Sequence, residues 1–125
     1  MIIDFHTHIF PEKIAERAIS NLAAVIRQKP TTNGCADGLR SSMKQAGIDI
    51  SVVLPVVTDV KQFDSILRFA VYINETYASV HEQRLISLSG IHPDDPDCKA
   101  HLALIKREGF AGVKVHPHYQ NVEFN

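Results

Sequence analysis

Four short apolar runs alternate with longer stretches of helical periodicity along this chain, and this alternation constrains the fold more than any other feature. The run at 50–57 is nearly continuous in β-branched and apolar residues, as in a parallel strand covered on both faces. Between the runs, apolar residues recur every three or four positions, which indicates amphipathic helices. The pattern predicts strands at 2–5, 50–57, 85–91 and 112–115, and helices at 11–28, 37–46, 61–82 and 95–108.

Strands that alternate with helices indicate an α/β fold with a parallel sheet and right-handed crossovers. We expect the first run to be buried, and we expect no helix after the fourth strand. A chain of 125 residues with 45% hydrophobic and 22% charged residues is typical of one compact domain and not of a disordered chain. We therefore predict a single α/β domain over residues 1–125.

Charge and hydropathy argue against several classes of partner. A net charge of −1 gives no electrostatic reason to expect nucleic acid or an anionic membrane. The apolar runs are shorter than the roughly 18 residues of a membrane span, and the first residues lack the basic start of a signal peptide. Cys35 and Cys98 lie far apart and indicate neither a disulfide framework nor a cysteine zinc site. We therefore expect a cytoplasmic protein.

The first two of the seven histidines carry the strongest chemical signal. His6 and His8 stand two residues apart at the end of the first predicted strand, so their side chains point to one face, with Asp4 one step deeper. The carboxyl ends of parallel strands are where α/β folds place ligands and active sites. Because imidazole suits zinc and other divalent transition metals, we predict that this pair supplies two metal ligands.

Lys114 and His116 share one face of the fourth predicted strand, opposite Val113 and Val115. If the valines face the helices, the lysine and histidine lie on the same side of the sheet as the first histidine pair. Lys114 is then a salt-bridge partner, an electrophile that steadies negative charge, or, after reaction with carbon dioxide, a metal-bridging carbamate. His116 is a ligand, a substrate contact or simply a residue at the strand exit.

His92 follows the third predicted strand in a His-Pro pattern that returns at His116. We therefore expect both histidines at the rim that the carboxyl ends of the strands form, with His92 facing substrate or supporting its neighbours. The aspartates within 94–97 could be metal ligands, but we interpret them as helix-capping residues. His81 and His101 are expected on helix surfaces, and His118 is not assigned.

Three segments resemble the amidohydrolase superfamily, in particular its amidohydrolase-related branch of predicted metal-dependent hydrolases with a TIM-barrel fold. They are MIIDFHTHIFP at 1–11, QAGIDISVVLP at 45–55 and GFAGVKVHPHYQ at 109–120. By this resemblance, His6 and His8 match the first-strand metal pair. Lys114 matches a fourth-strand position that bridges metals in some members and is often no ligand in this branch.

The resemblance implies the first four strands of a (β/α)8 barrel and a divalent metal, most often zinc, with manganese or iron as alternatives. It implies a small-molecule substrate and either hydrolysis of an amide, lactone or related carbonyl compound or nonoxidative decarboxylation. Lys114 and His116 would then be catalytic, and His92 would contact substrate. The family takes further ligands from its fifth, sixth and eighth strands, for which this sequence has no counterpart.

Two alternatives stay open. A phosphoesterase of the polymerase-and-histidinol-phosphatase type also begins with two histidines on a first strand and binds several metals. The second alternative is a half-barrel that is not an enzyme, binds metal weakly and associates with itself. Since four parallel strands leave two open edges, we expect a homo-oligomer that covers them.

Overall fold

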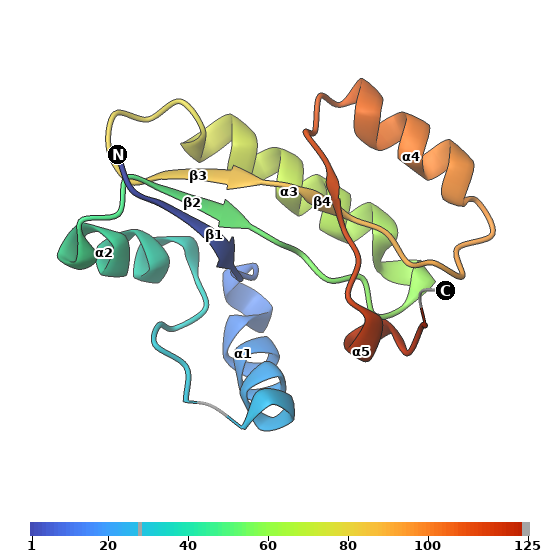
Figure 1. The fold of residues 1–125 in the computed structure, drawn as a ribbon, viewed down its shortest axis with the longest axis horizontal. Coiled ribbons are helices and arrows are strands. Elements are labelled where there is room, and N and C mark those ends of the chain that lie inside the picture. Colours follow the sequence, from blue (N-terminus) through green and yellow to red (C-terminus); the bar gives the residue numbers. More distant parts are fainter. Residues whose placement is uncertain (28, 124–125) are drawn as a thin grey trace.

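The computed structural model describes residues 1–27 and 29–123, which form a mixed α/β fold around a small parallel sheet (Figure 1). The elements, in chain order, are β1 (Ile3–Thr7), α1 (Glu12–Ile26), α2 (Ala36–Ala46), β2 (Ile50–Val53), the 3₁₀ turn η1 (Val60–Gln62), α3 (Phe63–Tyr77), β3 (Arg84–Ser87), β4 (Ser89–Gly90), α4 (Cys98–Arg107), β5 (Val113–Lys114) and α5 (Pro117–Gln120). The predicted α/β class is confirmed, and a half-barrel stays a prediction.

The described strands form two sheets, and both are parallel. β1, β2 and β3 pair in that order, and β4 pairs with β5 in a second ladder. The third predicted strand, 85–91, is divided into β3 and β4 at Leu88, whose N–H turns back to the Val53 carbonyl at 3.0 Å. The carboxyl ends of all four segments of extended chain therefore lie toward the same end of the fold.

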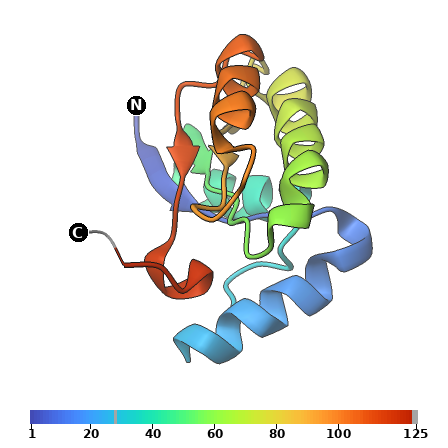
Figure 2. The ribbon, with the colours of Figure 1, turned by 90° about the vertical axis from the view of Figure 1, so that its right-hand side faces the viewer.

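Two hydrophobic clusters fix the helices against one face of the strands. The first joins α2 and α3 to β2 and β3, and its buried members are Ile9, Leu39, Met43, Val53, Ile73 and Leu85. The second joins α3 to α4 through Phe63, Leu67 and Ile105, and Val113 of β5 packs against it. The views in Figures 1 and 2 accordingly show α3 and α4 side by side on one side of the strands.

The prediction that the first strand is buried is wrong. The exposed fractions of Ile2, Ile3 and Phe5 are 57%, 46% and 68%. β1 is an edge strand that pairs with β2 only among the described strands, and none of its residues belongs to either hydrophobic cluster. A run of apolar residues indicates a strand, but it does not tell how many neighbours that strand has.

Helix boundaries differ from the sequence pattern where local turns intervene. α1 ends at Ile26, where Arg27 takes a left-handed conformation, and position 28, the predicted end, lies outside the described residues. α3 follows η1 and ends at Tyr77, so residues 78–83 form turns. α4 begins at Cys98, because the Asp95 carboxylate accepts the Asp97 N–H at 2.9 Å and holds a turn ahead of the helix.

The expectation of no helix after the fourth strand is also wrong. His116 is the N-cap of α5, and Pro117 occupies a first-turn position at which its missing N–H costs nothing. The helix spans Pro117–Gln120 and ends at Asn121 in a left-handed conformation. Within residues 1–27 and 29–123, no helix combines the length and apolarity that a membrane crossing requires.

Candidate functional site

The two histidines of the first segment lie together at the end of β1. His6 is in the strand and His8 is one residue beyond it, and their ring centroids are 5.1 Å apart in an edge-to-face arrangement. The register of β1 against β2 shifts between Asp4 and Thr7, as in a β-bulge, so that Phe5 and His6 stand opposite the single residue Val52. Bulges redirect side chains and are common beside active sites. The predicted convergence of the two rings is therefore present, with local geometry that a regular strand would not give.

The tautomer of His8 follows from its hydrogen bond. Its Nδ1 lies 2.8 Å from the carbonyl oxygen of Leu54, just beyond the end of β2. A carbonyl can only accept, so Nδ1 carries the proton and the lone pair of Nε2 is left for another partner. A histidine that donates one ring N–H to a backbone carbonyl is the usual arrangement around a metal ligand, since the bond orients the ring.

Lys114 and His116 lie within electrostatic range of this pair. Burial lowers the pKa of His8, its bond to Leu54 partly opposes this, and the charges of His6, Lys114 and His116 lower the pKa further. The pKa of His116 is also lowered, first by burial and then by the charge of Lys114. These shifts favour neutral imidazoles, the form in which histidine binds metal.

The position of Lys114 follows from the pleat of β5. Val113 packs against the cluster between α3 and α4, so the next residue, Lys114, projects from the opposite face of the strand. The sequence predicts the same arrangement, with Val113 toward the helices and Lys114 on the opposite face. The structure thus brings Lys114 to the side of the sheet that carries His6 and His8.

His116 has the opposite tautomer to His8. Its Nδ1 faces the backbone N–H of Tyr119 at 3.4 Å, and the two rings meet edge to face at 4.4 Å. An amide N–H can only donate, so Nδ1 accepts and the ring proton is on Nε2. His116 is therefore arranged as a hydrogen-bond donor at this rim, and its Nε2 is not a metal ligand in this tautomer.

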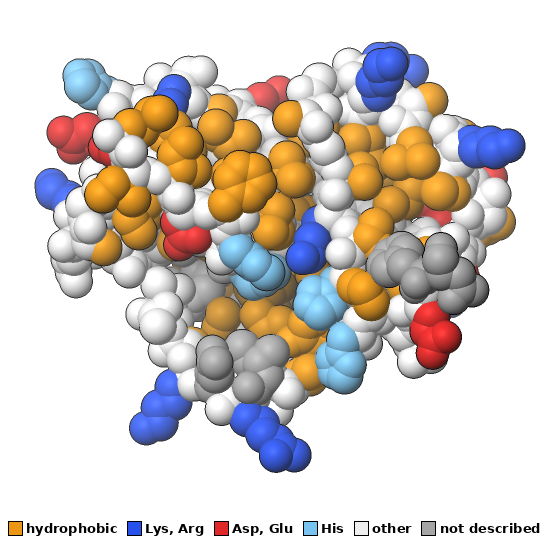
Figure 3. Space-filling view, viewed as in Figure 1, with side chains coloured by type: hydrophobic (Ala, Val, Ile, Leu, Met, Phe, Trp, Pro, Cys, Tyr) orange, Lys and Arg blue, Asp and Glu red, His pale blue; other side chains and the backbone are white. Residues whose placement is uncertain are grey.

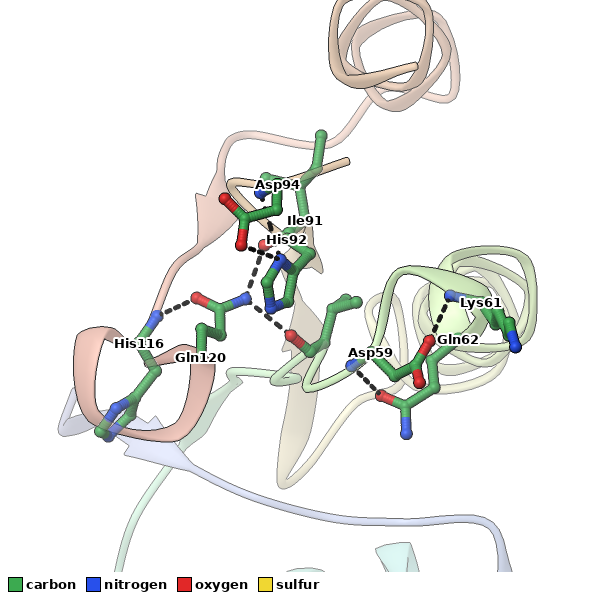
Figure 4. Close-up of polar contacts among 9 residues, drawn as sticks. Asp59, Lys61, Gln62, Ile91, His92, Asp94, His116 and Gln120 are labelled. Carbon is green, nitrogen blue, oxygen red and sulfur yellow. Dashed lines mark hydrogen bonds and ion pairs between the residues drawn. The ribbon is translucent and has the colours of Figure 1, made fainter. Parts of the chain in front are cut away.

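Gln120 braces the same rim and carries no signal in the sequence. Its buried amide nitrogen donates to the carbonyls of Val57 and Ile91, at 2.7 Å each, and its Oε1 accepts the backbone N–H of His116 at 2.7 Å. Figure 4 shows this amide between Ile91 and His116, with the His116 ring pointing away from it. One side chain thus ties together the segments that follow β2, β4 and β5.

His92 lies on the same rim but contacts a different group. Its side chain is buried, and its Nδ1 accepts the N–H of Asp94 at 3.2 Å (Figure 4). The Asp94 carboxylate lies 4.0 Å from the same ring nitrogen. His92 is therefore placed to hold the turn before α4, while the predicted substrate contact stays a prediction.

Two of the other histidine predictions need correction. His101 is on α4 as expected, but it is only partly exposed: its Nδ1 lies 2.6 Å from the buried Asp95 carboxylate, and its ring stacks on Phe63 at 3.7 Å. His81 is exposed but lies in the turns after α3 and not on a helix. His118, which the pattern left unassigned, is exposed on α5.

The residues present fit half of a metal site. Among residues 1–27 and 29–123, no three histidine, cysteine, aspartate or glutamate side chains gather as a group that could hold a metal ion. Zinc is usually held by four ligands, three of them from the protein in catalytic sites. Two imidazoles, one with its tautomer set by Leu54, supply part of such a set.

Two cavities meet at His8. One of about 330 Å³ includes Asp4, His6 and Thr7 in its wall, and another of about 460 Å³ includes Arg17 and Tyr119. Figure 3 shows histidine side chains beside a basic side chain and a hollowed, largely apolar surface near the middle of one face. The second cavity is large enough for a small molecule.

No family model, curated protein or solved structure matches this chain.

Proposed function

We propose that this chain forms the first-strand half of a metal-dependent hydrolase or decarboxylase site of amidohydrolase type, with His6 and His8 as metal ligands. The observation that carries the proposal is the bond between His8 Nδ1 and the Leu54 carbonyl. It leaves the Nε2 lone pair free, beside a second imidazole whose centroid is 5.1 Å away. A divalent cation, when bound there, would act as a Lewis acid toward a substrate carbonyl.

The neighbouring side chains are suited to bind and orient such a substrate. Lys114 carries a positive charge on the same side of the sheet and would stabilise negative charge that develops on a carbonyl oxygen. His116 presents Nε2–H, so it would donate a hydrogen bond to substrate. The cavity beside His8 that includes Arg17 and Tyr119 would accept the rest of a small, largely apolar molecule.

The metal claim is tested by a zinc competition titration against a chromophoric chelator, with the whole chain and single histidine variants. His6→Ala and His8→Ala should each weaken zinc binding by at least about tenfold. His81→Ala is the matched control, because His81 is exposed in the turns after α3 and should leave the affinity unchanged.

The same samples give the result that would overturn the proposal. If the unmodified chain retains less than about a tenth of an equivalent of zinc, manganese or iron after metal loading, it does not hold a site of this kind. Equal losses for His6→Ala and His81→Ala would mean that the bound metal lies elsewhere.

A further inference from the structure

The edge of the sheet at β1 exposes several large apolar side chains. Met1 and Ile2, just before β1, and Ile3 and Phe5, within it, have exposed fractions between 46% and 90%. In the described part of the chain, the outer edges of β1 and β5 have no strand beside them. Open, apolar strand edges promote association between chains unless something covers them.

The exposed area of the chain also favours association with another chain. A compact monomer of 13.9 kDa exposes about 6,700 Å². This chain exposes 8180 Å², which is about 1,500 Å² more. A stable interface buries about 800 Å² on each partner, and obligate dimers bury more. The excess is within the range of area that an obligate interface buries on each copy.

We propose that the occupant of this surface is a second copy of the chain, related by a two-fold axis that runs along the strands. Such an axis places β1 of each copy beside β5 of the other. Because β1 and β5 are the opposite edges of strands that all run in one direction, both new strand pairs are parallel and both open edges are used at once. The assembly then closes as a dimer and cannot extend into a fibre.

The same symmetry has a consequence for the histidine pair. An axis along the strands keeps the carboxyl ends of both sheets at one end of the dimer. The second copy thus brings its own pair of histidines to the rim that carries His6 and His8, where one described chain lacks a third ligand. This consequence rests on the proposed metal site, whereas the interface itself does not.

Light scattering coupled to size-exclusion chromatography tests the interface. The unmodified chain should have a mass of twice 13.9 kDa. Phe5→Glu replaces the most exposed apolar side chain within β1 and should weaken the dimer by at least about a hundredfold. Ile3→Glu is a second variant at the same edge, and Leu102→Glu, at a 40% exposed apolar position on α4, is the matched control. Circular dichroism verifies that each variant is folded.

The outcomes separate the interface from the metal site. A dimer that Phe5→Glu or Ile3→Glu converts to a folded monomer, and that Leu102→Glu leaves intact, supports the proposal. An unmodified chain that is monomeric at about 50 μM, or a dimer that only Leu102→Glu disrupts, overturns it. His6→Ala should weaken zinc binding and keep the dimer, so failure of metal binding alone does not contradict the proposed interface.

Discussion

The amide of Gln120 offers the sharpest test of how the rim is held together. In Gln120→Met the side chain keeps about the same length and loses three hydrogen bonds of 2.7 Å, two buried ones to Val57 and Ile91 and a partly buried one to His116. At about 1 kcal/mol for each bond, the free energy of unfolding should fall by about 3 kcal/mol. In urea, with a slope near 1.5 kcal/mol per molar, the unfolding midpoint should fall by about 2 M.

Equilibrium urea unfolding, followed by circular dichroism, measures this change. Gln45→Met is the matched control: Gln45 is exposed on α2, so its replacement should change the unfolding free energy by less than about 0.5 kcal/mol. A loss below about 1 kcal/mol for Gln120→Met would mean that these three backbone groups are satisfied without the Gln120 amide, contrary to this prediction.

Three further changes test other parts of the fold. Asp95→Asn should cost about 2 kcal/mol near neutral pH, measured by urea unfolding, because the carboxylate bonds His101 at 2.6 Å. Burial raises the pKa of Asp95, but the bonds from His101 and a backbone N–H lower it below its ordinary value of 3.8. The carboxylate therefore stabilises the fold above that value, and the difference between Asp95→Asn and the unmodified chain should shrink as the pH falls through the lowered pKa. Asn74→Ala removes the side chain that bonds Ser87 N–H at 2.7 Å and its carbonyl at 3.0 Å, and should lower the thermal unfolding free energy by about 2 kcal/mol. In Gly90→Ala the new methyl would lie 2.9 Å from a valine methyl and 3.0 Å from a carbonyl, so calorimetry should show a loss of about 1–3 kcal/mol.

The parts of the fold that sequence pattern predicts are those set by local periodicity. The run at 50–57 indicated a strand covered on both faces, and Ile50–Val53 is indeed buried at every position. The stop of α2 at Gly47, in a left-handed conformation, also follows from one residue and its neighbours. The exposure of Phe5 could not be predicted, because it depends on which strands and helices lie beside β1 and not on the run itself.

The sequence likewise predicts only part of the candidate site. The spacing of two residues predicts that His6 and His8 converge, but it does not predict the register shift in β1 beside them. The tautomer of His8 does not, since it depends on a carbonyl 46 residues away. Gln120 was missed because a glutamine after a predicted strand has no distinctive pattern, and its bonds reach 29 and 63 residues back along the chain. The roles of His8 and Gln120 therefore depend on contacts with distant segments of the chain, which residue type alone does not indicate.

Nitrogen-15 NMR of the histidine rings, with and without zinc, tests whether His6 and His8 bind the metal. The hydrogen bond to Leu54 requires that His8 carry its proton on Nδ1 in the free chain. On addition of zinc, the Nε2 resonance of His8 and one ring nitrogen of His6 should shift, while both nitrogens of the exposed His81 stay unchanged. A proton on Nε2 of His8 in the free chain, or the same zinc response from His81 as from His8, would contradict the account.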